Sequence, residues 1–187
     1  MAQTPQDSLR VLWVGNSFSY CNDLPGMVQK IASTQKVKLS CTRFLKGGER
    51  FSGHLKNKKL LQAIADGGWD YVVLQEQSTA PAMPTGQVAR EVYPAARTLD
   101  SLVHAASPDA RVIFYMTWGH KYGNRKPVAE YPLSNGYEGM QERLKTSYLE
   151  MTYDNDAWCA PVGMAWRTVR RERPDCILYR PDCYHPE

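Results

Sequence analysis

A serine near the beginning of the sequence and an aspartate and a histidine near its end are residues whose types fit a shared chemical task. Ser17 follows the apolar run VLWVG, and Asp182 and His185 lie three residues apart in RPDCYHPE, between two prolines. Prolines disfavour a helix, and residues at this spacing in a turn approach within about 7 Å. A carboxylate so placed orients one imidazole nitrogen and leaves the other free to take a proton from a hydroxyl, which makes a serine nucleophilic at neutral pH.

Each of these residues also has a simpler interpretation. Ser17, Ser19, Asn22 or Asp23 would cap a helix that begins near Leu24, because such side chains accept hydrogen bonds from the free N–H groups of a first turn. The stretch GNSFS lacks the second glycine of the G-x-S-x-G turn of α/β-hydrolases. The final aspartate and histidine are compatible with a polar tail. Only partners elsewhere in the chain favour chemistry over these alternatives.

Two further segments would supply such partners. Gly47 and Gly48, in KGGERFSGH, follow an apolar run, and glycine there lets backbone N–H groups face a ligand. Gln75, in QEQS, ends the next apolar run, where its amide would donate a hydrogen bond to a developing oxyanion. A tight turn and a side chain that satisfies a loop carbonyl are the alternatives for these two segments.

The hydrophobic pattern predicts the elements that must position these residues. Short apolar runs with the length of strands lie at residues 9–14, 36–45, 70–75, 110–116 and 157–162. Segments with helical spacing lie at 24–31, 55–64, 88–106 and 137–151, and a short one surrounds 166–169. Strands that alternate with helices pair in parallel and carry helices on both faces. The sequence therefore predicts a three-layer α/β/α sandwich.

Length and composition indicate one domain over residues 1–187, with residues 1–8 as a disordered N-terminal tail. The net charge is only +4, and the basic residues are scattered, which argues against nucleic-acid binding. No apolar run approaches the roughly 20 residues that cross a bilayer. The phosphate-loop pattern G-x-x-x-x-G-K-[ST] is absent, which disfavours a nucleotide-binding protein with a flavodoxin-like fold.

The cysteines and the acidic run DND suggest neither a metal nor a cofactor. The sequence contains five cysteines without C-x-x-C spacing, which argues against zinc. Their pairing stays open, although Cys176 and Cys183 could close a short disulfide loop. The run at 154–156 begins like a calcium loop but lacks the glycine and glutamate that such a loop requires. We expect no metal and no cofactor.

The segment 117–135 is long and follows an expected strand, so it would help to wall a ligand site at the carboxyl edge of the sheet. Its residues Trp118, His120 and Tyr122 would form an aromatic substrate-binding wall. His54, on the helix after the glycine pair, either faces the site or satisfies a buried polar group.

The order and positions of these blocks resemble the SGNH or GDSL-like hydrolase superfamily, most of all a bacterial branch of largely unassigned role. The blocks span nearly the whole chain: GNSFS, GGERFSGH, WDYVVLQEQS, MQERLKTSY with APVGMAW, and DCYHP. The resemblance implies a flavodoxin-like parallel sheet of five strands in the order 2-1-3-4-5. It also implies Ser17 as nucleophile, His185 as base and Asp182 as the partner that orients the base.

The resemblance further implies an oxyanion hole. Its donors would be the N–H of Ser17, a backbone N–H from the turn at Gly47 and Gly48, and the side chain of Gln75. Better-known members of the superfamily have asparagine where this chain has Gln75, and Gln77 is a second candidate donor. They also continue into a helix behind the histidine, whereas this sequence ends two residues after His185. We expect either a longer natural chain or a less supported base.

Together these features predict an esterase that acts through an acyl-enzyme on a small-molecule or carbohydrate ester, with O-acetyl groups on carbohydrate as the expected substrate. The alternative is a carbohydrate-binding or interaction protein that keeps the fold with little or no turnover. The polar start MAQTPQDS resembles the mature end of an exported protein, so we expect a periplasmic or secreted location, with a cytoplasmic one as the alternative. The oligomeric state is not predicted.

Overall fold

The computed structural model describes residues 8–124 and 132–187. The expected N-terminal tail, residues 1–8, lies outside the described residues except for Ser8. The strands are β1 Leu9–Gly15, β2 Leu39–Leu45, β3 Tyr71–Leu74, β4 Arg111–Tyr115 and β5 Trp158–Ala160. The α-helices are α1 Ser17–Tyr20, α2 Leu24–Thr34, α3 Phe51–His54, α4 Lys58–Ala65, α5 Thr85–Glu91, α6 Tyr93–Ala106, α7 Tyr137–Asp154 and α8 Val162–Glu172. Short 3₁₀ helices are η1 Cys21–Asp23, η2 Ala80–Ala82 and η3 Pro132–Asn135.

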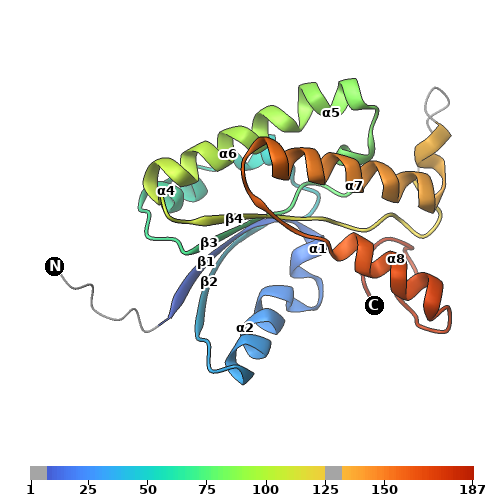
Figure 1. Cartoon of the computed structure of the whole chain (residues 1–187), viewed down its shortest axis with the longest axis horizontal. Coiled ribbons are helices and arrows are strands. Elements are labelled where there is room, and N and C mark those ends of the chain that lie inside the picture. The colour runs from blue at the N-terminus through green and yellow to red at the C-terminus, as the bar shows by residue number, and fades with distance from the viewer. Residues whose placement is uncertain (1–7, 125–131) are drawn as a thin grey trace.

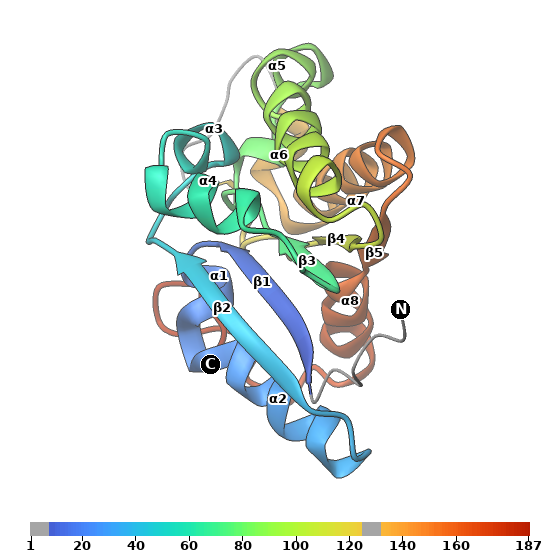
Figure 2. The same ribbon diagram turned by 90° about the vertical axis from the view of Figure 1, so that its left-hand side faces the viewer.

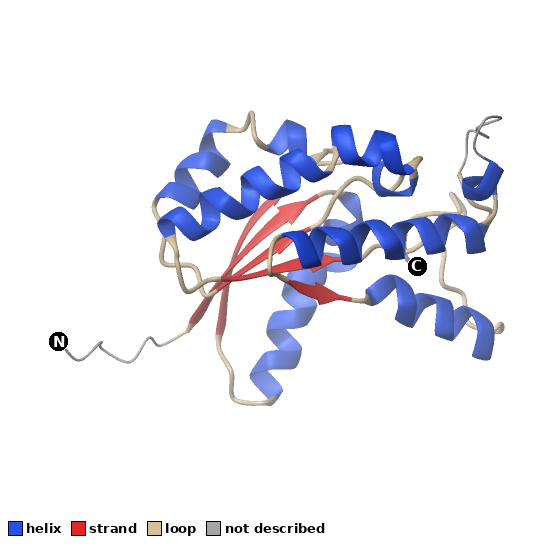
Figure 3. Ribbon diagram, turned by 45° about the horizontal axis from the view of Figure 1, so that its top comes forward, coloured by secondary structure: helices blue, strands red, loops and turns tan. Residues whose placement is uncertain are grey.

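The strands form a five-stranded sheet in the order β2-β1-β3-β4-β5, in which every neighbouring pair is parallel. Figure 3 shows the strands running side by side between helices. This confirms the expected flavodoxin-like sandwich and its strand order. Because the sheet is parallel, the carboxyl ends of the strands meet at one edge, and the loops that follow them gather there.

Alternation of side chains along the central strands builds a core on each face of the sheet. Leu12 and Val14 of β1 face one way and pack with α3, α4, α5, α6 and α7, whereas Val11 and Trp13 face the other way and pack with α1, α2 and α8. Figures 1 and 2 show these two layers of helices on opposite sides of the sheet. Both faces are covered, which explains why the central strands are continuously apolar.

Several boundaries differ from the expectation for reasons of local chemistry. The helix expected at 88–106 is divided into α5 and α6, because Pro94 lies at the start of α6 and has no N–H to continue the ladder. The helix expected at 55–64 begins later, as α4 at Lys58, where the Asn57 side chain caps it by accepting from the N–H groups of Lys59 and Leu60. The second strand begins at Leu39 and not at residue 36, where Lys36 has a φ of 61°.

The C-terminal end of the described chain lies near the short helix that begins with Ser17. Figures 1 and 2 both show the C-terminus beside α1. The side-chain amide of Asn22 donates to the carbonyl of Glu187 at 2.8 Å, which fixes this placement. Within the described ranges 8–124 and 132–187, no helix has the length and apolar character needed to cross a membrane.

Candidate active site

A cavity of about 640 Å³ lies at the carboxyl edge of the sheet, where the loops after β1, β2, β3 and β4 meet the C-terminal segment. The predicted site residues that line it are Ser17, Gly47, Gly48, Gln77, His120 and His185. Residues from both ends of the sequence therefore share one cavity. Five of the predicted residues do not line it, namely Gln75, His54, Trp118, Tyr122 and Asp182, and each is treated below.

Ser17 is the first residue of α1, in the sharp change of direction after β1. Asn16 precedes it in an extended conformation, and its side-chain oxygen accepts from the N–H of Phe18 at 3.2 Å. The helix cap is therefore Asn16, which leaves Ser17 available. Within the described part of the chain, neither the hydroxyl nor the backbone N–H of Ser17 makes a hydrogen bond, and the residue is only 9% exposed.

Asp182 and His185 form the predicted carboxylate–imidazole pair. The Asp182 side chain accepts from His185 Nδ1 at 2.8 Å and from the backbone N–H groups of Tyr184 and His185 at 3.0 Å each. Burial opposes ionisation of Asp182, but these hydrogen bonds outweigh it and lower its pKa to about 2. The carboxylate stays charged at neutral pH and directs the Nδ1 proton, so that His185 Nε2 is the nitrogen that can accept a proton.

The C-terminal hairpin, residues 179–187, holds His185 in place. Tyr179 pairs with Pro186 in an antiparallel bridge, and the N–H of Arg180 donates to the carbonyl of His185 at 3.0 Å. The indole of Trp118 donates to the carbonyl of Tyr184 at 3.0 Å. A hairpin thus supplies support that the sequence comparison with the superfamily did not lead us to expect.

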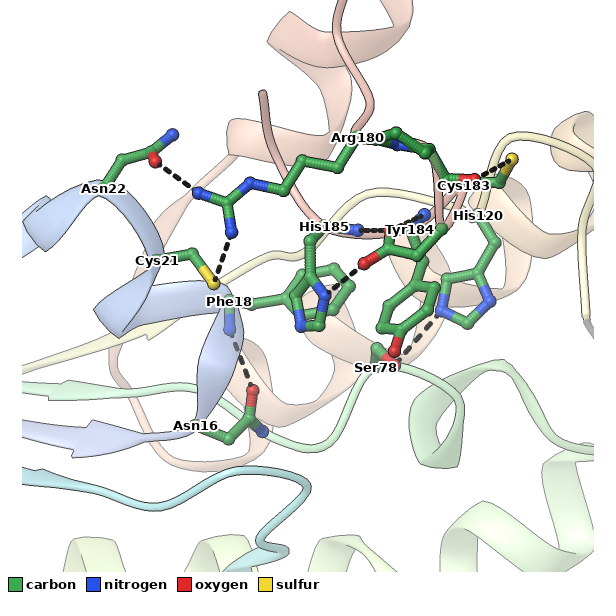
Figure 4. Close-up of polar contacts among 12 residues, drawn as sticks. Asn16, Phe18, Cys21, Asn22, Ser78, His120, Arg180, Cys183, Tyr184 and His185 are labelled. Carbon is green, nitrogen blue, oxygen red and sulfur yellow. Dashed lines mark hydrogen bonds and ion pairs between the residues drawn. The ribbon is translucent and has the colours of Figure 1, made fainter.

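A second set of contacts ties the hairpin to the region of the serine. The Arg180 guanidinium donates to the side-chain oxygen of Asn22 at 2.9 Å, and Figure 4 shows it reaching across to Asn22 and Cys21. The rings of Phe18 and His185 are 5.7 Å apart. These contacts place the imidazole beside the first turn of α1, which begins with Ser17.

Ser17 and His185 line the same cavity, but no hydrogen bond joins them among the described residues. The Nε2 atom of His185 is buried and unpartnered within the described ranges. Catalytic hydrogen bonds are often long in a free enzyme and shorten when substrate binds. Ser17 and His185, the predicted nucleophile and base, thus face a common space without a formed contact.

The glycine turn, residues 46–49, provides backbone donors beside Ser17. The N–H of Glu49 donates to the carbonyl of Lys46 at 3.0 Å, and Gly48 has a φ of 69°, which glycine adopts readily. The N–H groups of Gly47 and Gly48 make no hydrogen bond within the described chain, and both residues line the cavity. Both N–H groups are available to a ligand in the cavity, and their oxyanion role stays a prediction.

Gln75 does not donate to this cavity, and the oxyanion role predicted for its side chain is wrong in this structure. It is fully buried behind the serine turn, where its oxygen accepts from the N–H of Asn16 at 3.0 Å and from the hydroxyl of Ser19 at 2.9 Å. Its NH₂ group donates to the side chain of Asn16 and to the carbonyl of Glu76. Both amide protons are used, so Gln75 positions the backbone that carries Ser17.

Gln77 is the better-placed amide. Its oxygen accepts from the N–H groups of Thr79 and Ala80 at 2.8 and 2.9 Å, which fixes the loop after β3. It lines the cavity, and its NH₂ group makes no hydrogen bond among the described residues. The side chain is therefore available to a ligand.

His54 does not line the cavity. It satisfies a buried polar group, which was the second of the two interpretations offered for it. Its Nε2 lies 2.9 Å from the carbonyl of Gly15, and the residue is 2% exposed. Burial lowers the pKa of His54, against the hydrogen bond to Gly15, which raises it. A neutral imidazole that donates from Nε2 satisfies the last carbonyl of β1, directly before the serine turn.

The predicted aromatic wall is correct for only one of its three members. Trp118 is buried between Phe18 and Trp166, with ring centroids 4.7 and 4.2 Å away. Tyr122 is 68% exposed and lies outside the cavity. His120 lines the cavity, with its Nε2 3.1 Å from the hydroxyl of Ser78.

Tyr184, which the sequence did not single out, lies between the two imidazoles of the cavity. Its ring centroid is 4.2 Å from that of His185 and 5.2 Å from that of His120, and Figure 4 shows the three rings side by side. The sequence pointed to Tyr184 only in that this residue directly precedes the proposed base, His185, in DCYHP.

Asn16 is a further functional residue that the sequence reasoning missed. Its NH₂ group donates to the carbonyl of Glu49 at 3.1 Å, while its oxygen accepts from Phe18 and Gln75. One side chain thus connects the serine turn, the glycine turn and the end of β3. An asparagine directly before a candidate helix start was the signal that could have identified it.

Within residues 8–124 and 132–187, no group of three or more metal-ligating side chains could hold a metal ion. All five cysteines are free in the structure. The described groups at this cavity include the Ser17 hydroxyl, the His185 imidazole with its Asp182 partner, and the N–H donors of the glycine turn.

Sheet order, the serine turn and the Asp–His pair define a class: the protein has the fold of the SGNH/GDSL-like hydrolases. A DUF4886 family protein from Bacteroides uniformis has a TM-score of 0.76 at 16% identity, over 97% of this chain and 77% of its own. The acetyl xylan esterase AlAXEase has a TM-score of 0.69 at 15% identity, over 96% of this chain and 92% of its own.

The acetylxylan esterase Axe2 from Geobacillus stearothermophilus has a TM-score of 0.68 at 10% identity, over 97% of this chain and 89% of its own. No protein-family model matches the sequence, and no curated protein matches it. At these identities the likeness establishes the fold.

Proposed function

We propose that the protein is a serine esterase that cleaves its substrate through an acyl-enzyme. The observation that carries this proposal is the cavity into which both Ser17 and His185 face, with Asp182 2.8 Å from the far nitrogen of the imidazole. A serine, an unpartnered imidazole nitrogen and free backbone donors in one cavity are the groups that acyl transfer needs.

In the proposed reaction, the Ser17 hydroxyl attacks the ester carbonyl as His185 Nε2 takes its proton. The oxyanion that forms accepts hydrogen bonds from the N–H of Ser17 and from the glycine turn. Collapse of this intermediate breaks the bond to the alcohol, which leaves with the proton held by His185. Water then attacks the acyl group by the reverse sequence and restores the free serine.

Hydrolysis of p-nitrophenyl acetate by the wild-type protein, Ser17→Ala and Ser101→Ala tests this proposal. Ser101 is an exposed residue of α6 remote from the cavity, so its variant controls for handling and folding. We expect Ser17→Ala to abolish turnover and Ser101→Ala to retain it. A fluorophosphonate probe followed by mass mapping should label Ser17; labelling of another serine, or equal hydrolysis by all three proteins, would reject the proposal.

We further propose an O-acetyl group on a carbohydrate as the substrate. Two of the solved structures with this fold are named acetylxylan esterases, and the cavity combines aromatic rings with the polar side chains of Gln77 and Ser78. Release of acetate from acetylated xylan, compared with hydrolysis of p-nitrophenyl acetate and butyrate, tests this choice. Faster cleavage of the butyrate than of either acetate would point to a different acyl group.

The alternative is a binding protein with this fold and little turnover. The observation that favours it is the absence, among the described residues, of a hydrogen bond between Ser17 and His185. A binder would bind acetylated oligosaccharides with the same affinity before and after Ser17→Ala and would release no acetate. Calorimetric titration with both proteins separates the two proposals.

A further inference from the structure

Glu76 is a buried acidic residue beside the cavity that the proposed mechanism does not use. It lies between the two glutamines that follow β3 and is only 1% exposed. Its carboxylate accepts from the N–H of Phe51 at 3.2 and 3.3 Å, one distance for each oxygen, and from the N–H of Gln77 at 2.6 Å. Acidic side chains are rarely buried this fully unless other groups pair with the carboxylate.

These partners belong to two different loops of the cavity. Phe51 is the first residue of α3, two positions after the glycine turn, and the intervening Arg50 provides no side-chain cap. Glu76, just beyond the end of β3, takes the place of the missing cap. Gln77 lies in the loop after β3, so a single carboxylate connects the segment after the glycine turn to the loop whose Gln77 amide makes no hydrogen bond among the described residues.

The contact pattern matches the ionised form of the side chain. The three contacts come from N–H groups, which only donate, and a carboxylate only accepts. A proton on Oε2 would leave Oε1 as an acceptor for both N–H groups but would remove the second acceptor of Phe51. The protonation state of Glu76 thus determines how firmly the N–H of Phe51 is held.

We propose that the Glu76 carboxylate is a positioning residue of the active site, which holds the glycine turn and the Gln77 loop at the spacing that the oxyanion requires. This inference rests on the proposed esterase function for its catalytic consequence, whereas the connection between the loops does not depend on that function. Loss of the proton from Glu76 gives the N–H of Phe51 its second acceptor and so completes this connection.

The surroundings of Glu76 place this transition in the neutral range. Burial raises the pKa of Glu76 to about 7, against the hydrogen bonds from Gln77 and Phe51, which lower it. Arg50 also lowers this pKa and Glu49 raises it, both from the segment before α3. Tyr148 of α7 is the other titratable group that faces Glu76, and its hydroxyl accepts from the backbone N–H of Glu76 at 3.2 Å.

A pH–rate profile of p-nitrophenyl acetate hydrolysis tests the inference with the wild type, Glu76→Gln and Glu172→Gln. Glu172 is an exposed residue of α8 and serves as the matched control. We expect Glu76→Gln to lower kcat by about tenfold or more with little change in KM. This decrease is smaller than the loss of about 100- to 1000-fold in kcat that follows removal of an oxyanion donor. On the acid side, log kcat/KM should fall more steeply in the wild type than in Glu76→Gln, because the variant no longer takes up a proton at this position.

An acid limb of the same shape in Glu76→Gln and the wild type would overturn the inference. Should Glu76→Gln fold poorly, the wild type alone provides a second test by NMR. The amide signals of Phe51 and Gln77 should titrate together with a midpoint near pH 7, and independent or absent titrations would also overturn the inference. If these amides titrate but the wild type neither hydrolyses esters nor labels at Ser17, the proposed esterase function fails while the connection stands.

Discussion

Buried side chains position Ser17, whereas a partly exposed hairpin positions His185. The residues that position the serine turn are almost inaccessible: Asn16 is 1% exposed, Ser19 and Gln75 are 0% and His54 is 2%. On the histidine side, 34% of the Asp182 side chain is exposed and the contact between Arg180 and Asn22 lies at the surface. Hydrogen bonds in a buried network are stronger and more costly to break than those in water. The proposed nucleophile is thus fixed by the core, while the position of the proposed base depends on surface contacts.

Removing the charge of Asp182 should produce the largest effect and should act on the histidine side alone. Asp182→Asn keeps the size of the side chain but no longer selects the tautomer of His185, so we expect kcat for p-nitrophenyl acetate to fall by about 1000- to 10,000-fold. Steady-state kinetics beside Ser101→Ala measures this loss. A decrease of less than about tenfold would mean that the base is oriented by the hairpin backbone alone.

Gln75→Ala should affect stability first, because it acts on the buried serine side. The substitution leaves the N–H of Asn16 and the hydroxyl of Ser19 without an acceptor and opens a cavity, so we expect a loss of about 2–4 kcal/mol in the free energy of unfolding. Urea unfolding measures it, with Gln62→Ala on the exposed face of α4 as control. A stable variant with a large loss of kcat would instead restore Gln75 to the oxyanion hole.

His54→Gln should change how the serine side responds to acid. Burial lowers the pKa of His54 in the folded chain. When the pH falls below the ordinary pKa of histidine, the unfolded chain therefore binds a proton at this residue that the folded chain does not bind. The free energy of unfolding of the wild type should therefore fall as the pH decreases through that range. Glutamine keeps a donor for the carbonyl of Gly15 but does not titrate, so the variant should show a weaker decrease in urea unfolding experiments across that pH range. Parallel curves for the two proteins would contradict this sign.

The smallest effect is expected for Arg180→Ala on the histidine side. The lost contacts with Asn22 and Cys21 lie near the surface, so stability should change by less than about 1 kcal/mol. The hairpin would nevertheless become more mobile, and kcat should fall by about two- to fivefold with unchanged KM. Arg173→Ala, which removes an exposed pair with Asp175, is the control. A loss as large as that of Asp182→Asn would show that the two sides are held equally firmly.

Sequence predicted the parts of the site that depend on strand order. Parallel strands must end at one edge, so the residues after the first and second strands were correctly placed around one cavity. The spacing of Asp182 and His185 likewise determined their contact, because a three-residue separation in a turn leaves few alternatives.

Residues beyond the strand ends could not be placed in this way. β3 ends at Leu74, so the alternation of side chains gives no information about Gln75 and the residues after it. Gln75 turned inward and Gln77 toward the cavity, a choice made by the partners each found among Asn16, Ser19 and Thr79. Trp118 was misjudged for a similar reason: aromatic content indicated a substrate wall, but two neighbouring rings bury it in the core.

The bond between Asn22 and Glu187 joins residues 165 positions apart and bears on the order of folding. Closing so long a segment carries an entropic cost that local helices and adjacent strands do not carry, so such contacts form late. During refolding from urea, fluorescence from tryptophans buried within the sandwich, such as Trp13 and Trp69, should recover before esterase activity does. The interval between the two signals would measure how long after the sheet forms the C-terminal hairpin brings His185 to the cavity.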